Sequence, residues 1–153
     1  ADLYLQTINE LEKNGFEQYE ISNFSKKGFE CRHNLKYWRC EEYIGLGPSA
    51  HSFFNGKRYE VPRSLGDFVS NEFQTEVVNE EHPHTFDEVA MLRLRLAEGL
   101  SRNVCEEFNV DFDGIIKKAE PLEKAGLVEI STTGIVITKK GFLFSNLIIG
   151  ELI

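Results

Sequence analysis

The first 60 residues contain only two segments with the pattern of a β-strand, and this shortage limits what they can fold into. Residues 16–21 alternate apolar and polar side chains, which predicts a strand. Residues 43–48 predict a short buried strand that runs into a glycine-rich loop. These two strands and a predicted helix over 2–14 are typical of the end of an α/β repeat. Two strands alone cannot form a parallel sheet with both faces buried. We therefore expect residues 1–60 to be part of a domain whose other strands are missing from this sequence.

We expect the chain to be processed or, more simply, to be a piece of a longer protein. It begins with Ala1, and its only methionine is Met91. The incomplete sheet supports the same expectation. Its 153 residues suffice for one ordinary domain or two small ones.

The second half carries clear helix signals. Residues 65–78 can form a helix, and residues 85–88 form a capping box before an apolar stripe at helical spacing. Ser101 is predicted to cap a short helix that ends at Phe108. Asp111 or Asp113 is predicted to cap a longer helix that ends at Gly126. Pro121 lies inside that helix and predicts a kink or a break.

The rest of the second half predicts a hairpin and a closing helix. Residues 127–130 and 135–138 are rich in β-branched side chains, and residues 131–134 form the turn between them. A last helix is predicted over 140–152. The order helix, helix, hairpin, helix is typical of a winged-helix-like module.

Charge and cysteine content exclude several classes of function. Residues 1–65 carry nine basic and nine acidic side chains, whereas residues 66–153 carry eight and 16. The acidic second half argues against a nucleic-acid partner, because phosphate binding needs a basic face. The three cysteines are an odd number and contain no CxxC spacing, which favours reduced thiols over a disulfide framework or a zinc site.

Residues 32–38 combine a histidine, an amide and two aromatic side chains in what we predict to be a loop. His33 could ligate a metal or haem iron, with Tyr37 and Trp38 against a planar macrocycle. The rings could equally anchor the loop while His33 bonds to backbone. The pattern alone favours this structural interpretation, because buried aromatic side chains are usually part of a core.

Two further places could hold a ligand. The glycines of residues 45–51 follow a predicted strand, where backbone can approach a ligand closely, but a tight turn needs glycine as well. Glu20 and Asn23 end the first predicted strand and suit either a polar ligand or a solvated edge.

Several blocks of the sequence resemble the oxygen-independent coproporphyrinogen III oxidase-like radical SAM family. Residues 15–24, 33–38 and 45–52 carry the resemblance in the first half. Residues 33–38 have the HNxxYW form that is distinctive of the HemW-type haem chaperones within this family. Residues 91–100 and 138–146 resemble the family's C-terminal domain. The blocks occur in order over nearly the whole chain, which makes them more specific together than singly.

The resemblance implies an α+β chain made of two parts. Residues 1–62 would be the last α/β elements of a partial (β/α)6 radical SAM barrel. Residues 63–153 would be the HemN-type C-terminal domain, which is small, mainly helical and winged-helix-like, with a β-hairpin. The family's CxxxCxxC motif is absent from this sequence. We therefore expect a [4Fe–4S] cluster and S-adenosylmethionine (SAM) only in the full-length parent, and no SAM cleavage by the chain itself.

The same resemblance assigns site residues. It makes His33 the haem-contacting histidine and possible iron ligand, with Asn34, Tyr37 and Trp38 completing the motif, and so reverses the structural interpretation of His33. The residues that match the loop near bound SAM in the oxidase branch are Gly47, Ser49, Ala50 and His51. In that branch an apolar residue stands in place of His51. No catalytic residue is predicted.

The HNxxYW run favours a haem-binding chaperone that passes haem to acceptor proteins. Two alternatives stay open. The parent could be an oxygen-independent coproporphyrinogen III oxidase, which decarboxylates coproporphyrinogen III to protoporphyrinogen IX, or the acidic C-terminal module could be a protein-interaction domain. For both the chaperone and the oxidase, the expected ligand is a tetrapyrrole. We expect a cytoplasmic protein without a membrane span, and self-association through exposed strand edges.

Overall fold

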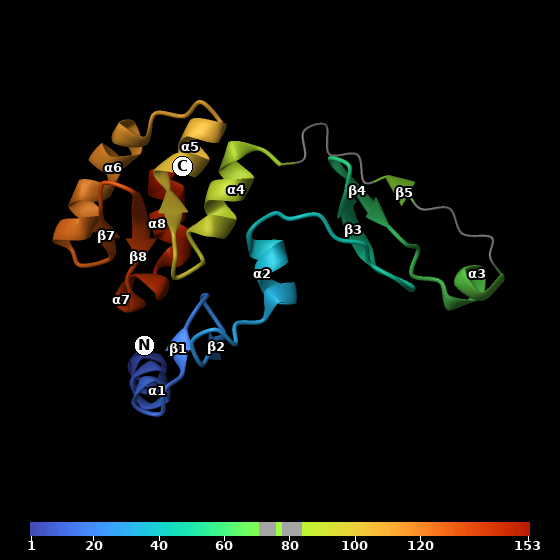
Figure 1. Ribbon diagram of the computed structural model, residues 1–153, viewed down its shortest axis with the longest axis horizontal. Coiled ribbons are helices and arrows are strands. Elements are labelled where there is room, and N and C mark those ends of the chain that lie inside the picture. The colour runs from blue at the N-terminus through green and yellow to red at the C-terminus, as the bar shows by residue number, and fades with distance from the viewer. Residues whose placement is uncertain (71–75, 78–83) are drawn as a thin grey trace. The chain divides into compact units, whose positions relative to one another are not determined.

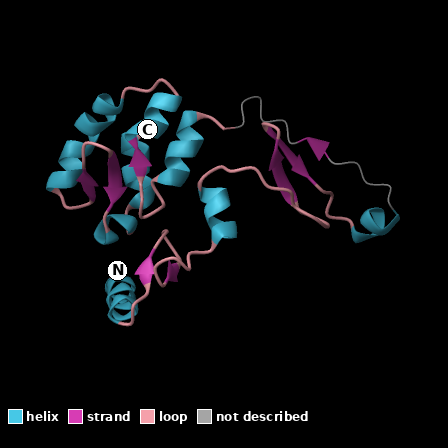
Figure 2. Ribbon diagram, viewed as in Figure 1, coloured by secondary structure: helices cyan, strands magenta, loops and turns pink. Residues whose placement is uncertain are grey.

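The computed structural model describes residues 1–70, 76–77 and 84–153 (Figure 1). The chain forms two compact units, which are described separately below. Unit 1 comprises Ala1–Arg39 and Phe86–Ile153, and unit 2 comprises Cys40–Thr85. Helices and short strands occur in both units, as Figure 2 shows, which confirms the mixed α and β composition. The domain boundary predicted near residue 62 stays a prediction.

The N-terminal part of unit 1 begins with the predicted helix. Helix α1 covers Asp2–Lys13 and buries Ile8 completely. Gly15 then adopts a positive φ of 80°, and strand β1 (Glu17–Gln18) pairs antiparallel with β2 (Phe24–Ser25). The strand predicted over 16–21 is therefore shorter than expected. Every strand pairing among the described residues is antiparallel, so the predicted barrel end is not confirmed.

A helix stands where the sequence predicts an irregular loop. Helix α2 covers Arg32–Trp38 and includes the whole HNxxYW run. The prediction failed because Cys31, at the N-cap, supplies no side-chain hydrogen bond. In addition, none of the seven side chains of α2, all within the described residues, is buried. A helix without a buried face needs no apolar stripe in its sequence, so the usual periodic signal is missing.

The C-terminal part of unit 1 packs helices around a three-stranded antiparallel sheet (Figure 1). The sheet has the order β6-β8-β7, and β7 with β8 is the predicted hairpin. The elements are α4 (Phe86–Arg93), β6 (Leu100–Ser101), α5 (Arg102–Glu107), α6 (Phe112–Lys124), β7 (Val128–Ile130), β8 (Gly134–Ile137), α7 (Lys139–Phe142) and α8 (Ser145–Leu152). Fully buried apolar side chains from α4 to α8 form its core, among them Leu94, Leu96, Leu100, Ile135 and Ile148.

Local capping signals give the helix starts correctly. The Ser101 hydroxyl accepts the Val104 N–H at the start of α5, and the Asp111 carboxylate accepts the Asp113 N–H at the start of α6. Helix α6 continues through Pro121 without a break. The predicted closing helix over 140–152 is wrong as a single element. It divides into α7 and α8, because Phe144 leaves the helical conformation with φ −122° and ψ 20°.

Replacing the Asp111 cap tests this account of α6. We expect Asp111→Ala to lower the free energy of unfolding by about 1 kcal/mol, because the Asp113 N–H loses its acceptor. Asp111→Asn keeps an acceptor oxygen and should stay close to the wild type. Urea unfolding followed by circular dichroism measures both. Equal losses in the two variants would assign the effect to charge rather than to the cap.

Unit 2 contains an antiparallel sheet of order β3-β4-β5 and one helix. The elements are β3 (His51–Phe54), β4 (Lys57–Glu60), α3 (Leu65–Ser70) and β5 (Glu76–Val77). Asn55 and Gly56 join β3 to β4, both with positive φ. The predicted strand over 43–48 is wrong, since only Tyr43 pairs there, in a single bridge to Phe53. The predicted helix over 65–78 forms as α3 but gives way to β5, and residues 71–75 and 78 lie outside the described residues.

Candidate functional site

The HNxxYW helix brings two of its predicted haem-binding residues together. His33 and Tyr37 lie one helical turn apart, and the Tyr37 hydroxyl is 2.8 Å from Nε2 of His33. Their ring centroids are 4.9 Å apart in an edge-to-face arrangement, with an interplanar angle of 83°. Both side chains are exposed. Helix α2 therefore presents an imidazole nitrogen and a phenol oxygen side by side on its solvent face.

The other two motif residues make different contacts. The Asn34 amide donates a 3.4 Å hydrogen bond to the Tyr19 hydroxyl. Trp38 is half-buried, and its indole N–H has no acceptor among the described residues. The motif thus has an outward pair, His33 and Tyr37, and two half-buried members. Asn34 contacts the rest of unit 1, whereas the indole N–H of Trp38 has no acceptor among the described residues.

An ion-pair cluster holds the C-terminal end of α2. Arg39, the C-cap residue, donates from Nε and Nη2 to the two carboxylate oxygens of Glu98, at 3.0 and 2.8 Å. Arg93 donates to the same carboxylate at 3.1 Å and to the Arg39 carbonyl at 3.4 Å. The three side chains, named here the Glu98 clamp, join α2 to the end of α4 and to the turn that follows it.

The Glu98 clamp should be sensitive to acid. Chiefly the hydrogen bond from Arg39, helped by the charges of Arg39 and Arg93, lowers the pKa of Glu98 below its ordinary value of 4.5, while burial opposes the shift. A lowered pKa in the folded state means that the clamp stabilises the fold above pH 4.5. That contribution is lost as the pH falls through the lowered value. It is modest, because 46% of the Glu98 side chain is exposed.

We expect the wild type to lose stability relative to Glu98→Gln on acidification below the ordinary carboxyl pKa. The variant carries no titrating group at this position, so the difference between the two profiles isolates Glu98. Denaturant midpoints measured from neutral to acidic pH provide the check. Parallel profiles would show that the Glu98 pKa is the same in the folded and unfolded states.

The residues predicted to approach SAM all lie in unit 2. The Ala50 N–H donates to the Gly47 carbonyl at 3.1 Å, and Ser49, with a φ of 62°, donates its N–H to Val61. His51 is exposed at the start of β3. An apolar cavity of about 470 Å³ lies beside this loop, lined by Ile44, Leu46, Phe54, Tyr59, Val61 and Phe68 among others. Of the four predicted residues only Gly47 lines it.

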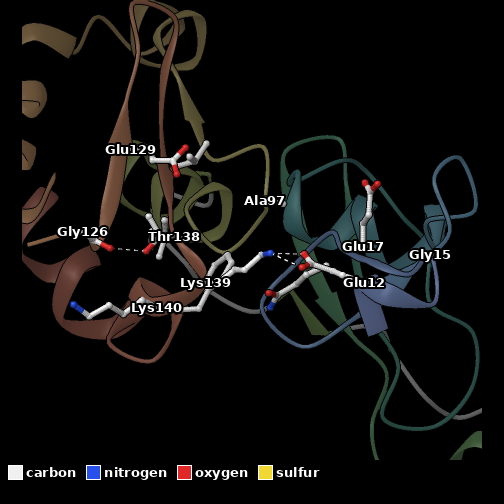
Figure 3. Close-up of a pocket in the computed structure, with 13 residues that line it drawn as sticks. Glu12, Gly15, Glu17, Ala97, Gly126, Glu129, Thr138, Lys139 and Lys140 are labelled. Atoms are coloured by element: carbon white, nitrogen blue, oxygen red, sulfur yellow. Dashed lines mark hydrogen bonds and ion pairs between the residues drawn. The ribbon is translucent and has the colours of Figure 1, made fainter. Parts of the chain in front are cut away.

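A cleft of unit 1, shown in Figure 3, has none of the predicted site residues among the described residues that line it. It has a volume of about 730 Å³ and lies between α1 with β1 and the β7–β8–α7 segment. Lys139 crosses it to Glu12, with a 2.6 Å hydrogen bond to Oε2. Acidic and basic side chains both line the cleft, so it selects no charge class of ligand. A contact between residues so far apart in the chain has no local sequence signal.

Glu20 and Asn23 do not form a shared site. Glu20 is fully buried, and its Oε1 accepts the Ser22 N–H at 3.1 Å. Asn23 is exposed. The buried carboxylate therefore belongs to the interior of unit 1, beside the backbone bridge between Glu20 and Leu96.

The residues present do not fit an iron–sulfur cluster. Cys31, Cys40 and Cys105 are free thiols, and Cys105 is fully buried. Burial raises the pKa of the Cys105 thiol, which disfavours a thiolate ligand there. Within the described ranges no three His, Cys, Asp or Glu side chains lie close enough to hold a metal ion. The helices in those ranges are also too short or too polar to span a bilayer.

Comparison with known proteins gives consistent results. Residues 82–144 match the family model of the HemN C-terminal domain. The chain is 32% identical to "Heme chaperone HemW" of Bacillus subtilis, over 98% of this chain and 41% of that protein. It is 31% identical to the HemW of Lactococcus lactis, over 95% of this chain and 40% of that protein. The chain thus spans about 40% of the length of these relatives.

A solved structure shares the fold. The Escherichia coli coproporphyrinogen III oxidase HemN, a radical SAM enzyme, superposes with a TM-score of 0.64 at 18% identity. The match covers 99% of this chain and 40% of that one. Identity this low shows a common fold and does not carry the activity. The resemblance stated from the sequence blocks is confirmed by the family model and the relatives together.

Proposed function

We propose that this chain, a relative of the HemN/HemW-like radical SAM proteins, binds haem on helix α2 and that the whole protein passes it to acceptor proteins. The observation that carries the proposal is the exposed, hydrogen-bonded pair of His33 and Tyr37. Histidine nitrogen and tyrosine oxygen both serve as axial ligands of haem iron. The name of the two bacterial relatives, heme chaperone, supports the same cargo.

The hydrogen bond of the pair has a consequence for iron binding. The Tyr37 hydroxyl shares Nε2 of His33 in the free chain. If His33 binds iron through Nε2, this bond is exchanged for the coordination bond, whereas binding through Nδ1 leaves it in place. Where the bond stays in place, it limits the rotation of the His33 ring. An exposed ligating side chain also suits a haem that must be transferred, because an acceptor protein can reach the bound haem.

The remaining assignments are proposals about the whole protein. We assign residues 1–62 to the end of its barrel and residues 63–153 to its winged-helix-like C-terminal domain. Gly47, Ser49, Ala50 and His51 are proposed to lie toward SAM. SAM and a [4Fe–4S] cluster would supply radical chemistry there, but the cysteines of this chain do not fit the cluster, and no step is assigned to it.

A haem titration followed by absorbance tests the proposal. We expect a saturable shift of the Soret band at one haem per chain, and loss of that shift when an acceptor protein freed of its own haem is added. Metal-free protoporphyrin IX is the matched control, because it is the ring of haem without the iron. A spectrum that stays that of free haem, or equal binding of both porphyrins, would contradict iron ligation by this chain.

A further inference from the structure

We infer that Glu98 is a positioning residue for the α2 site, an inference that rests on the proposed haem-binding function. Helix α2 has only seven residues, and Cys31 gives it no side-chain cap. None of its side chains, all within the described part of the chain, is buried. Helices of this length are marginal in water unless tertiary packing holds them. Something outside α2 must therefore fix the His33–Tyr37 pair in space.

The Glu98 clamp is a charge-assisted contact that reaches the end of α2 from outside the helix. Two N–H groups of Arg39 meet the two carboxylate oxygens of Glu98, which is the bidentate geometry of a strong charge-assisted pair. Arg93 adds a third donor to the carboxylate. The Asn34 bond to Tyr19, at 3.4 Å, is long by comparison. Because Arg39 is the C-cap residue, holding its side chain also sets how far α2 can rotate or unwind.

Glu98 itself belongs to a turn that cannot easily move. Leu96 and Leu100, on either side of it, are fully buried. Gly99 has a φ of 67°, and a Cβ at this position would lie 2.1 Å from the Ile135 carbonyl oxygen. The turn is thus packed directly against β8 of the sheet. The clamp connects a marginal helix to the core of unit 1, across 59 residues of sequence.

The experiment compares Glu98→Ala with a matched ion-pair control, Asp113→Ala. Asp113 lies in the first turn of α6 and pairs with Arg102 at 2.7 Å, also with part-exposed side chains. We expect Glu98→Ala to weaken haem binding about tenfold, while Asp113→Ala leaves it unchanged. Amide hydrogen exchange should accelerate in α2 of Glu98→Ala and stay the same in α6. Glu98→Gln, which keeps one acceptor oxygen, should restore part of the affinity.

The outcomes separate this inference from the proposed function. If the wild type binds haem and Glu98→Ala binds it equally well, the inference is overturned and the proposed function stands. If the wild type does not bind haem, the proposed function fails, and exchange in α2 alone decides whether Glu98 anchors the helix. Arg39→Met breaks the clamp from the other side and replaces Glu98→Ala should that variant fail to fold. Unchanged exchange in α2 of both variants would overturn the anchoring role.

Discussion

We expect His33→Ala to weaken haem binding by more than about a hundredfold and to remove the saturable Soret shift. Even the hydrogen-bond partners of ligating histidines contribute 10–100-fold to metal affinity, so loss of the ligand itself should exceed that range. His33 is exposed, and helix α2 tolerates alanine well, so the fold should survive the substitution. The measurement is the haem titration described above, with circular dichroism to confirm that the helix content is unchanged.

Tyr37→Phe is the matched control for that result. It keeps the ring that lies edge-to-face against His33 and removes only the hydroxyl. We expect about a tenfold loss of affinity, the effect of a positioning partner rather than of a ligand. If His33→Ala binds haem normally while Tyr37→Phe does not, the iron ligand is Tyr37, and the proposed assignment within the pair is wrong.

What the sequence could predict depends on how local the stabilising contacts are. Ser101 and Asp111 cap the helices that follow them through bonds to residues two or three positions away, and both were predictable. The β7–β8 hairpin has its turn signal between its strands. Helix α2 depends instead on Glu98, 59 residues away, and its own residues carry neither a cap nor an apolar stripe. A helix of that kind has no local signal.

One missed element did have a signal. Asn55 and Gly56 are the residue pair most typical of a two-residue hairpin, and both adopt the positive φ that such a turn requires. The strand before this turn is β3, which begins at His51 and not within the predicted residues 43–48. For the site, the sequence supplied the residues of HNxxYW. Their division into an outward pair and half-buried neighbours follows only once the run is helical.

Gly141→Ala should unfold or severely destabilise unit 1, by roughly 3 kcal/mol or more. A Cβ at Gly141 would lie 1.9 Å from the Leu127 carbonyl oxygen and 2.8 Å from Cγ2 of Ile137. Leu127 is held by backbone bonds from Thr138 and to Leu122, so its carbonyl cannot retreat without opening the hairpin. Overpacking of a core costs 1–3 kcal/mol even where side chains can adjust, and here backbone must move.

Gly150→Ala is the matched comparison, because it makes the same change in a helix with open space. Nothing lies within 4 Å of a Cβ at Gly150, which is exposed in α8. Alanine there should stabilise the fold by about 0.5–1 kcal/mol through its better helix propensity. Urea midpoints of the two variants should therefore move in opposite directions from the wild type. If Gly141→Ala is as stable as the wild type, α7 does not pack on the Leu127 backbone. Gly141 would then have no structural role.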